Sequence, residues 1–134
     1  MRDKKLDQLV AQMENYLECW KQYSHFVSLA RAKKFTAEDE QQFLDVKAVL
    51  IQELEIIYAA IDCSSPSKED VHNLLSNSPS LRYMGEGSDP SFRSMETAWH
   101  KIFVGFQAIL GQLKVKQREM EGKSMFSSLF GKKK

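Results

Sequence analysis

The sequence predicts an all-α protein: an antiparallel bundle of three long helices, with one short helix and a flexible carboxyl-terminal tail. Two observations predict this fold class. Apolar residues recur in alternating steps of three and four over three long stretches, and polar capping residues precede the later helices. With 134 residues, of which 43% are apolar and 28% charged, the chain suits a single globular domain.

The first long helix is predicted over residues 3–33. Residues 31–34, RAKK, put positive charge at its end, where the helix dipole is negative. The apolar positions that share one face are Leu6, Leu9, Val10, Met13, Tyr16, Leu17, Trp20, Tyr23, Val27 and Ala30.

The second helix is predicted over about residues 37–62. Thr36 can accept a hydrogen bond at its start, and acidic residues follow in the first turn. One apolar stripe runs along Phe43, Val46, Leu50, Leu54, Ile57 and Ile61, and a second along Leu44, Ala48, Ile51 and Tyr58. Since a helix that is apolar on two sides is normally central, we expect it between the first helix and a later one, paired with the first as a hairpin.

Residues 64–91 predict a short helix flanked by turns. Ser65 and Pro66 read as an N-cap followed by a first-turn proline, so this helix should extend to Leu75 or Ser76. The turn-rich stretch after it contains a small apolar patch of Leu81, Tyr83 and Met84. This patch either docks on the body or forms a candidate binding loop.

The last long helix is predicted to open at Asp89 and Pro90. Gly105 and Gly111 each cost about 1 kcal/mol relative to alanine in a helix, which suggests close helix approach or a bend. Gly122 is predicted to end the helix. Its apolar stripe comprises Phe92, Met95, Trp99, Ile102, Phe103, Phe106, Ile109, Leu110, Leu113 and Met120.

The chain is therefore divided into a bundle over residues 1–121 and a basic amphipathic tail over residues 122–134, expected to be disordered when free. As a helix, the tail would put its apolar residues on one face. The candidate partner- or membrane-binding residues are Met125, Phe126, Leu129, Phe130, Lys132, Lys133 and Lys134.

Charge is distributed unevenly along the chain. Residues 114–134 carry a net charge of +5, whereas residues 1–113 carry −4, within a total of +1. Nucleic-acid binding is not favoured, because such proteins spread basic residues over the fold and this body is acidic. No stretch has the roughly 18 consecutive apolar residues of a spanning helix, and residues 1–10 lack an apolar signal region, so we expect a cytoplasmic protein.

No motif in the sequence predicts catalysis, a metal or a cofactor. Glu69 and His72 have the spacing of a di-iron ligand pair, but such sites need two copies of the motif and further carboxylates. Cys19 and Cys63 lack a CxxC or other activating motif, and small buried apolar roles are expected for both. We therefore expect no enzyme activity, no metal site and no cofactor.

The sequence favours a non-enzymatic protein-interaction or adaptor module with an unknown protein partner. The first alternative is a peripheral membrane protein held reversibly on an anionic surface by its tail. The second is a metal-dependent enzyme. A homodimer is a further hypothesis, since a partner could complete the bundle with spare apolar residues of the first two helices.

Overall fold

The computed structural model describes residues 3–61 and 65–130, with side chains described as far as Gly122. This part of the chain is all-α, as predicted, and contains no strand. Its helices are α1 (Lys4–Ala32), α2 (Ala37–Ala60), α3 (Lys68–Ser76), α4 (Leu81–Gly85) and α5 (Asp89–Phe130).

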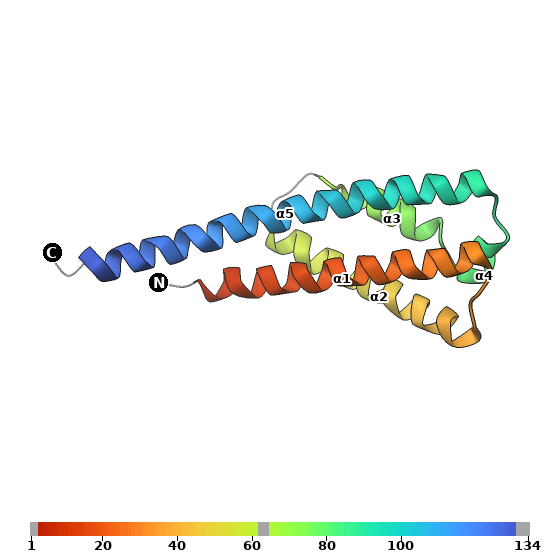
Figure 1. Cartoon of the computed structure of the whole chain (residues 1–134), viewed down its shortest axis with the longest axis horizontal. Coiled ribbons are helices and arrows are strands. Elements are labelled where there is room, and N and C mark those ends of the chain that lie inside the picture. The colour runs from red at the N-terminus through yellow and green to blue at the C-terminus, as the bar shows by residue number, and fades with distance from the viewer. Residues whose placement is uncertain (1–2, 62–64, 131–134) are drawn as a thin grey trace.

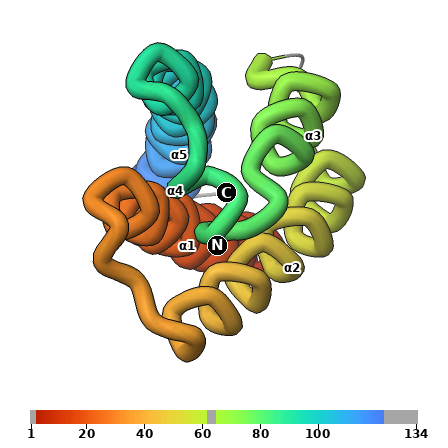
Figure 2. The backbone as a smooth tube through the Cα atoms, turned by 90° about the vertical axis from the view of Figure 1, so that its right-hand side faces the viewer, coloured from red at the N-terminus to blue at the C-terminus, as the bar shows by residue number. Residues whose placement is uncertain are grey.

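The helix at the centre of the packing is α1. It contacts α2, α4 and α5, whereas α3 packs against α5 and α2. Figure 1 shows α2 and α5 running back alongside α1, and the end-on view of Figure 2 shows α1, α2, α3 and α5 around a common axis. The prediction that the second helix is central is therefore wrong.

Side-chain caps fix where the first two helices begin. The Asp3 carboxylate accepts hydrogen bonds from the backbone N–H groups of Lys5 and Leu6, at 3.0 and 3.1 Å. Thr36 and Asp39 form a reciprocal capping box at the start of α2, with distances of 3.1 and 2.9 Å. Such caps satisfy N–H groups that have no partner within the helix.

The predicted start of the short helix is shifted, whereas α5 begins at Asp89 as predicted, with a different capping residue. The α3 helix begins at Lys68 with Ser67 as its N-cap, and the preceding Pro66 follows a cis peptide bond outside the helix. At α5, Ser88 caps the helix by accepting from the N–H of Ser91 at 3.3 Å. The short helix α4 was not predicted, because its five residues are too few to show a helical period.

The predicted end of the last helix at Gly122 is also wrong, because the backbone of α5 stays helical through Phe130. A glycine ends a helix by adopting a positive φ, which none of the described glycines has. The predicted flexible tail thus begins inside a helix, and residues 131–134 lie outside the described residues.

The core is aromatic, as the sequence predicted. Trp20, Tyr16, Tyr23, Phe43 and Phe106 are its largest fully buried side chains. Tyr16 meets Phe106 edge-on at 5.2 Å between ring centroids, and the Tyr16 hydroxyl donates to the Leu50 carbonyl at 2.9 Å. These contacts join α1 to both α2 and α5.

The second apolar stripe of α2 is mostly exposed, contrary to prediction. Leu44 and Ile51 keep 39% and 41% of their surface exposed, and Ala48 is exposed as well. Only Tyr58 is partly buried, where its hydroxyl donates to the Pro66 carbonyl. The stripe has no long helix against it because α5 packs on α1 instead.

Candidate functional site

A groove of about 840 Å³ lies at the end of the bundle where α1 starts. We call it the open-end groove. It exists because α3 has only nine residues and α2 stops at Ala60, while α5 continues far beyond both. Its lining residues are Asp3, Lys5, Leu6, Gln8, Leu9, Gln12, Ala60, Ile61, Ile109, Gln112, Leu113, Lys116, Glu119 and Met120.

The lining of the groove is mixed: aliphatic side chains from three elements lie beside the polar side chains of Gln8, Gln12 and Gln112. Leu6 and Leu9 from α1 and Ile61 from the end of α2 are partly buried aliphatic side chains. Ile109 and Leu113 from α5 are buried, with 5% and 6% of their surface exposed. In a four-helix bundle this position would be covered by another helix.

The rim of the groove is polar and carries both signs of charge. Asp3 and Lys5 lie on the α1 side, and Lys116 and Glu119 on the α5 side. All four residues are exposed. An apolar floor between charged edges matches the surface of an amphipathic helix.

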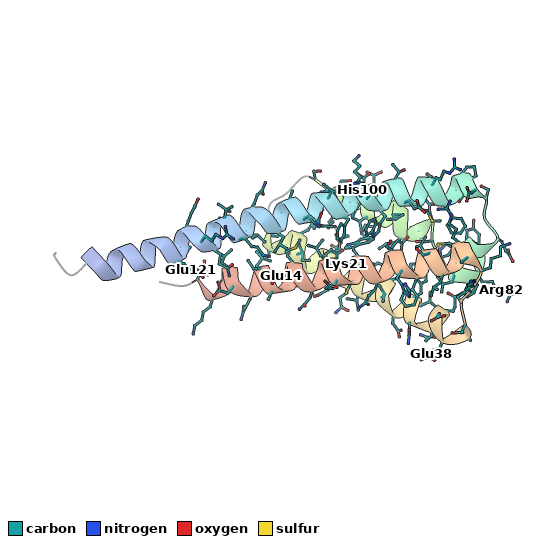
Figure 3. All side chains as sticks on the ribbon, viewed as in Figure 1. Glu14, Lys21, Glu38, Arg82, His100 and Glu121 are labelled. Atoms are coloured by element: carbon teal, nitrogen blue, oxygen red, sulfur yellow. The ribbon has the colours of Figure 1, made fainter. Side chains whose placement is uncertain are left out.

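Polar contacts join α1 to α5 beside the groove. Gln117 donates to the Asp7 carboxylate at 2.7 Å, and Lys114 lies 3.2 Å from the Glu14 carboxylate. The side-chain view in Figure 3 shows Glu14 between the two helices and Glu121 where α5 passes the start of α1. The wall formed by α5 is therefore fixed relative to the floor.

Exposed apolar side chains also lie on α2, on both sides of the stripe that enters the core. At about 100° per residue, Leu44 and Ile51 share one side and Val49 and Ile56 share another; they are 39%, 41%, 41% and 45% exposed in the order Leu44, Ile51, Val49, Ile56. We call this set the outer α2 surface. None of its four residues lines the open-end groove.

The predicted binding loop forms part of α4. Leu81 and Met84 are buried, whereas Tyr83 is 63% exposed. The Glu40 carboxylate of α2 accepts hydrogen bonds from the backbone N–H groups of Leu81 and Arg82, at 2.8 and 3.1 Å. This leaves Tyr83 as the member of the patch that a partner could reach.

The candidate tail residues fall into two groups. The positions of Met125, Phe126, Leu129 and Phe130 lie in α5, although their side chains are outside the described part. Lys132, Lys133 and Lys134 lie outside the described residues altogether. Among the described helices, none combines the length and apolar character needed to cross a membrane.

Metal-ligand chemistry is not assembled in the described residues. Within them, no group of three or more His, Cys, Asp or Glu side chains could hold a metal ion. His72 lies beside Glu55, with Nε2 and Oε2 3.7 Å apart, and Lys68 forms an ion pair with the same carboxylate at 2.9 Å. Lys68, followed by His72, lowers the pKa of Glu55, which is typical of a surface ion pair.

The thiol of Cys19 is not activated. It is half-buried rather than fully buried as expected, and burial, followed by the charges of Glu53 and Glu18, raises its pKa. A raised pKa favours the thiol over the nucleophilic thiolate. Cys63 lies outside the described residues.

Sequence reasoning did not find the open-end groove. Leu6, Leu9, Ile61, Leu113 and Met120 were each placed on a core stripe, and nothing in a stripe shows which of its residues lack a facing helix. The available signal was the difference in predicted helix length. A short third helix cannot cover the full length of the other three.

Comparisons with known proteins assign no family to this chain. No protein-family model matches it, and neither a curated protein nor a solved structure matches it.

Proposed function

We propose that the chain is a small non-enzymatic adaptor of the cytoplasm, with α1, α2 and α5 as its antiparallel three-helix scaffold. In this proposal the open-end groove binds one amphipathic helix of another protein chain. The bound helix takes the position that the short α3 leaves uncovered, and so completes the bundle.

The observation that carries this proposal is the apolar floor of the groove. Leu6, Leu9 and Ile61 lie only partly buried between three helices that are already fixed to one another. Burying apolar surface contributes about 25 cal/mol per Å², so a helix that covers these side chains gains affinity without reorganising the bundle. The charged rim adds orientation more than affinity.

A synthetic peptide tests the groove as a helix-docking site. The probe is a fluorescein-labelled peptide of about five helical turns, with leucine at every third or fourth position and equal numbers of lysine and glutamate between. Its zero net charge separates apolar docking from simple attraction to the acidic body. We expect saturable binding by fluorescence anisotropy.

Matched variants locate the binding. Leu6→Lys places a charge in the groove and should weaken binding at least about tenfold, since a buried unpaired charge is costly. Ile51→Lys makes the same kind of change on the outer α2 surface and should leave binding unchanged. Absence of saturable binding, or equal loss in both variants, would contradict the proposal.

Membrane attachment through residues 123–134 is the alternative function, and one observation supports it. Because α5 remains helical through Phe130, the apolar residues of the tail follow one another on a preformed helix. Lys123 and Lys132–Lys134 would add about 1 kcal/mol each near anionic lipid. Co-sedimentation with anionic vesicles that weakens as the salt concentration rises would support this function. Failure to co-sediment at both low and high salt would exclude it.

A further inference from the structure

The backbone of α5 continues beyond the start of α1 (Figure 1). Gln117 of α5 donates a hydrogen bond to Asp7 of α1, and Glu121 lies level with the start of α1 (Figure 3). From Glu121 to Phe130 the helix continues for nine residues, or about 14 Å at 1.5 Å per residue. We call residues 122–130 the α5 arm.

The arm cannot reach the groove of its own chain. Helix α5 is continuous, and Figure 1 shows it leading away from the bundle past the start of α1. Folding back onto Leu6 and Leu9 would require breaking the helix. Any groove that the arm occupies must therefore belong to a different molecule.

One row of α5 positions connects the groove wall to the arm. Its members follow each other in steps of 4, 3, 4, 3 and 4 residues, which keeps them on one side of a helix. They are Gln112, Lys116, Glu119, Lys123, Phe126 and Phe130. The first three line the open-end groove, and the last three belong to the arm.

This row is symmetric about Glu121. In an antiparallel pair of α5 helices that cross there, Gln112 faces the partner's Phe130, and Lys116 faces the partner's Phe126. Glu119 then faces the partner's Lys123. By the two-fold symmetry Lys123 also faces the partner's Glu119, so the interface contains this opposite-charge pair twice. An isologous interface requires such self-complementary positions.

We propose that two copies of this chain associate through their α5 helices, with the arm of each copy lying over the open-end groove of the other. This inference rests on the proposed function, because it names the helix that the groove accepts. In this register the positions of Phe126 and Phe130 of each arm lie opposite Lys116 and Gln112 on the partner's groove wall, next to the aliphatic lining residues of that groove. Glu119 and Lys123 fix the antiparallel register.

The phenylalanines of two arms supply part of the surface that a stable dimer buries. A phenylalanine buries about 150–250 Å², so the four phenylalanines contribute up to about 600–1,000 Å². A standard interface buries about 1,600 Å² in total. The proposal assigns the remainder to the partly buried groove residues and to the stems of Lys116 and Lys123.

Charge reversal tests the register directly. With Glu119→Lys each copy carries a lysine at both positions 119 and 123. With Lys123→Glu each copy carries a glutamate at both positions. We expect either variant alone to dimerise at least about tenfold more weakly than the original chain in sedimentation equilibrium, because like charges face each other. An equimolar mixture of the two variants should recover the dimer, since every facing pair is again of opposite charge.

Two further variants separate the arm from the rest of the surface. Phe126→Ser combined with Phe130→Ser removes the apolar anchors and should give a monomer whose thermal unfolding midpoint does not depend on protein concentration, whereas that of the dimeric original chain rises with concentration. Val104→Lys alters an exposed valine of α5 outside the row and should leave the dimer intact. Circular dichroism confirms that each variant is folded.

The inference is overturned if the original chain is a monomer at concentrations of about 100 μM, where even weak specific association is visible. It is equally overturned if the mixture of charge variants fails to recover the dimer, or if the double serine variant still dimerises. Saturable docking of the neutral peptide alongside a monomeric chain would leave the proposed function standing and reject only the second copy as the occupant.

Discussion

At the scale of single residues, the glycines of α5 have different surroundings although they look alike in the sequence. A Cβ placed on Gly105 would lie 2.8 Å from the Pro66 Cδ atom. The same addition at Gly111 meets nothing within 4 Å. Gly105 is therefore required by the close approach of Pro66 to α5. No packing contact of the described residues requires a glycine at position 111.

Alanine substitutions should move stability in opposite directions at these two positions. Gly111→Ala should raise the free energy of unfolding by about 1 kcal/mol, the helix-propensity difference between the two residues. Gly105→Ala gains the same propensity but overpacks against the rigid proline ring at a cost of about 1–3 kcal/mol, so it should be neutral to destabilising. Urea denaturation measures the free energy of unfolding of both variants. Equal stabilisation by the two substitutions would contradict the close packing of Gly105 against Pro66.

The buried hydroxyl of Tyr23 gives the protein a dependence on alkaline pH. Tyr23 donates to the Ser78 hydroxyl at 2.7 Å, and Ser78 donates to the Leu74 carbonyl at 2.9 Å. Burial raises the pKa of Tyr23 from 10.0 to about 12, against the lowering effect of the Ser78 hydrogen bond. The buried Tyr16 also has a raised pKa, with burial as the largest cause.

Stability should therefore fall as the pH rises from 10 toward 12. Below pH 10 both states keep the phenol proton, but above it the unfolded chain releases the proton first, which favours unfolding. The loss attributable to Tyr23 is roughly 2–3 kcal/mol over this window. Urea denaturation at several pH values should show a smaller fall for Tyr23→Phe, and an identical fall would refute the assignment.

At the scale of elements, α2 shows what apolar periodicity can and cannot predict. Capping at Thr36 and the stripe through Phe43, Leu50 and Leu54 correctly predicted where the helix lies and which face enters the core. The second stripe was visible too, but its interpretation as buried was wrong. Periodicity identifies an apolar face without identifying what covers it, since that depends on how the other helices pack.

Neighbouring residues of α2 provide the test of this correction. Leu50 is fully buried, so Leu50→Ala should cost about 2–5 kcal/mol. Ile51 is 41% exposed, and Ile51→Ala should change the free energy of unfolding by no more than about 0.5 kcal/mol. A cost for Ile51→Ala as large as that for Leu50→Ala would show that the stripe is buried after all.

The short elements mark the limit of local sequence signals. Helix α4 depends on Glu40, which binds its first N–H groups from 41 and 42 residues earlier in the chain. The start of α3 was misplaced at Ser65 and Pro66, whereas the helix is capped by Ser67, whose hydroxyl accepts from the N–H of Asp70 at 3.0 Å. The contact of α4 with Glu40 is a long-range one that no local pattern shows.

At the scale of the whole molecule, unequal helix lengths create the feature with the clearest functional meaning. In the end-on view α1, α2, α3 and α5 surround a common axis (Figure 2), and α3 covers only part of the length of the bundle (Figure 1). The open-end groove lies where α1 begins. The sequence predicted long helices and a tail with apolar residues. It did not predict that the tail extends α5 or that a groove lies beside it, because both depend on which helices end first.

Methyl NMR of the full chain during titration with the neutral amphipathic peptide tests the central claim, that the open-end groove is a helix-docking site. We predict saturable shifts for the methyl groups of Leu6, Leu9, Ile61, Ile109 and Leu113, with those of Leu44, Ile51 and Ile56 unmoved. Shifts confined to the outer α2 surface, or none that saturate, would contradict the claim.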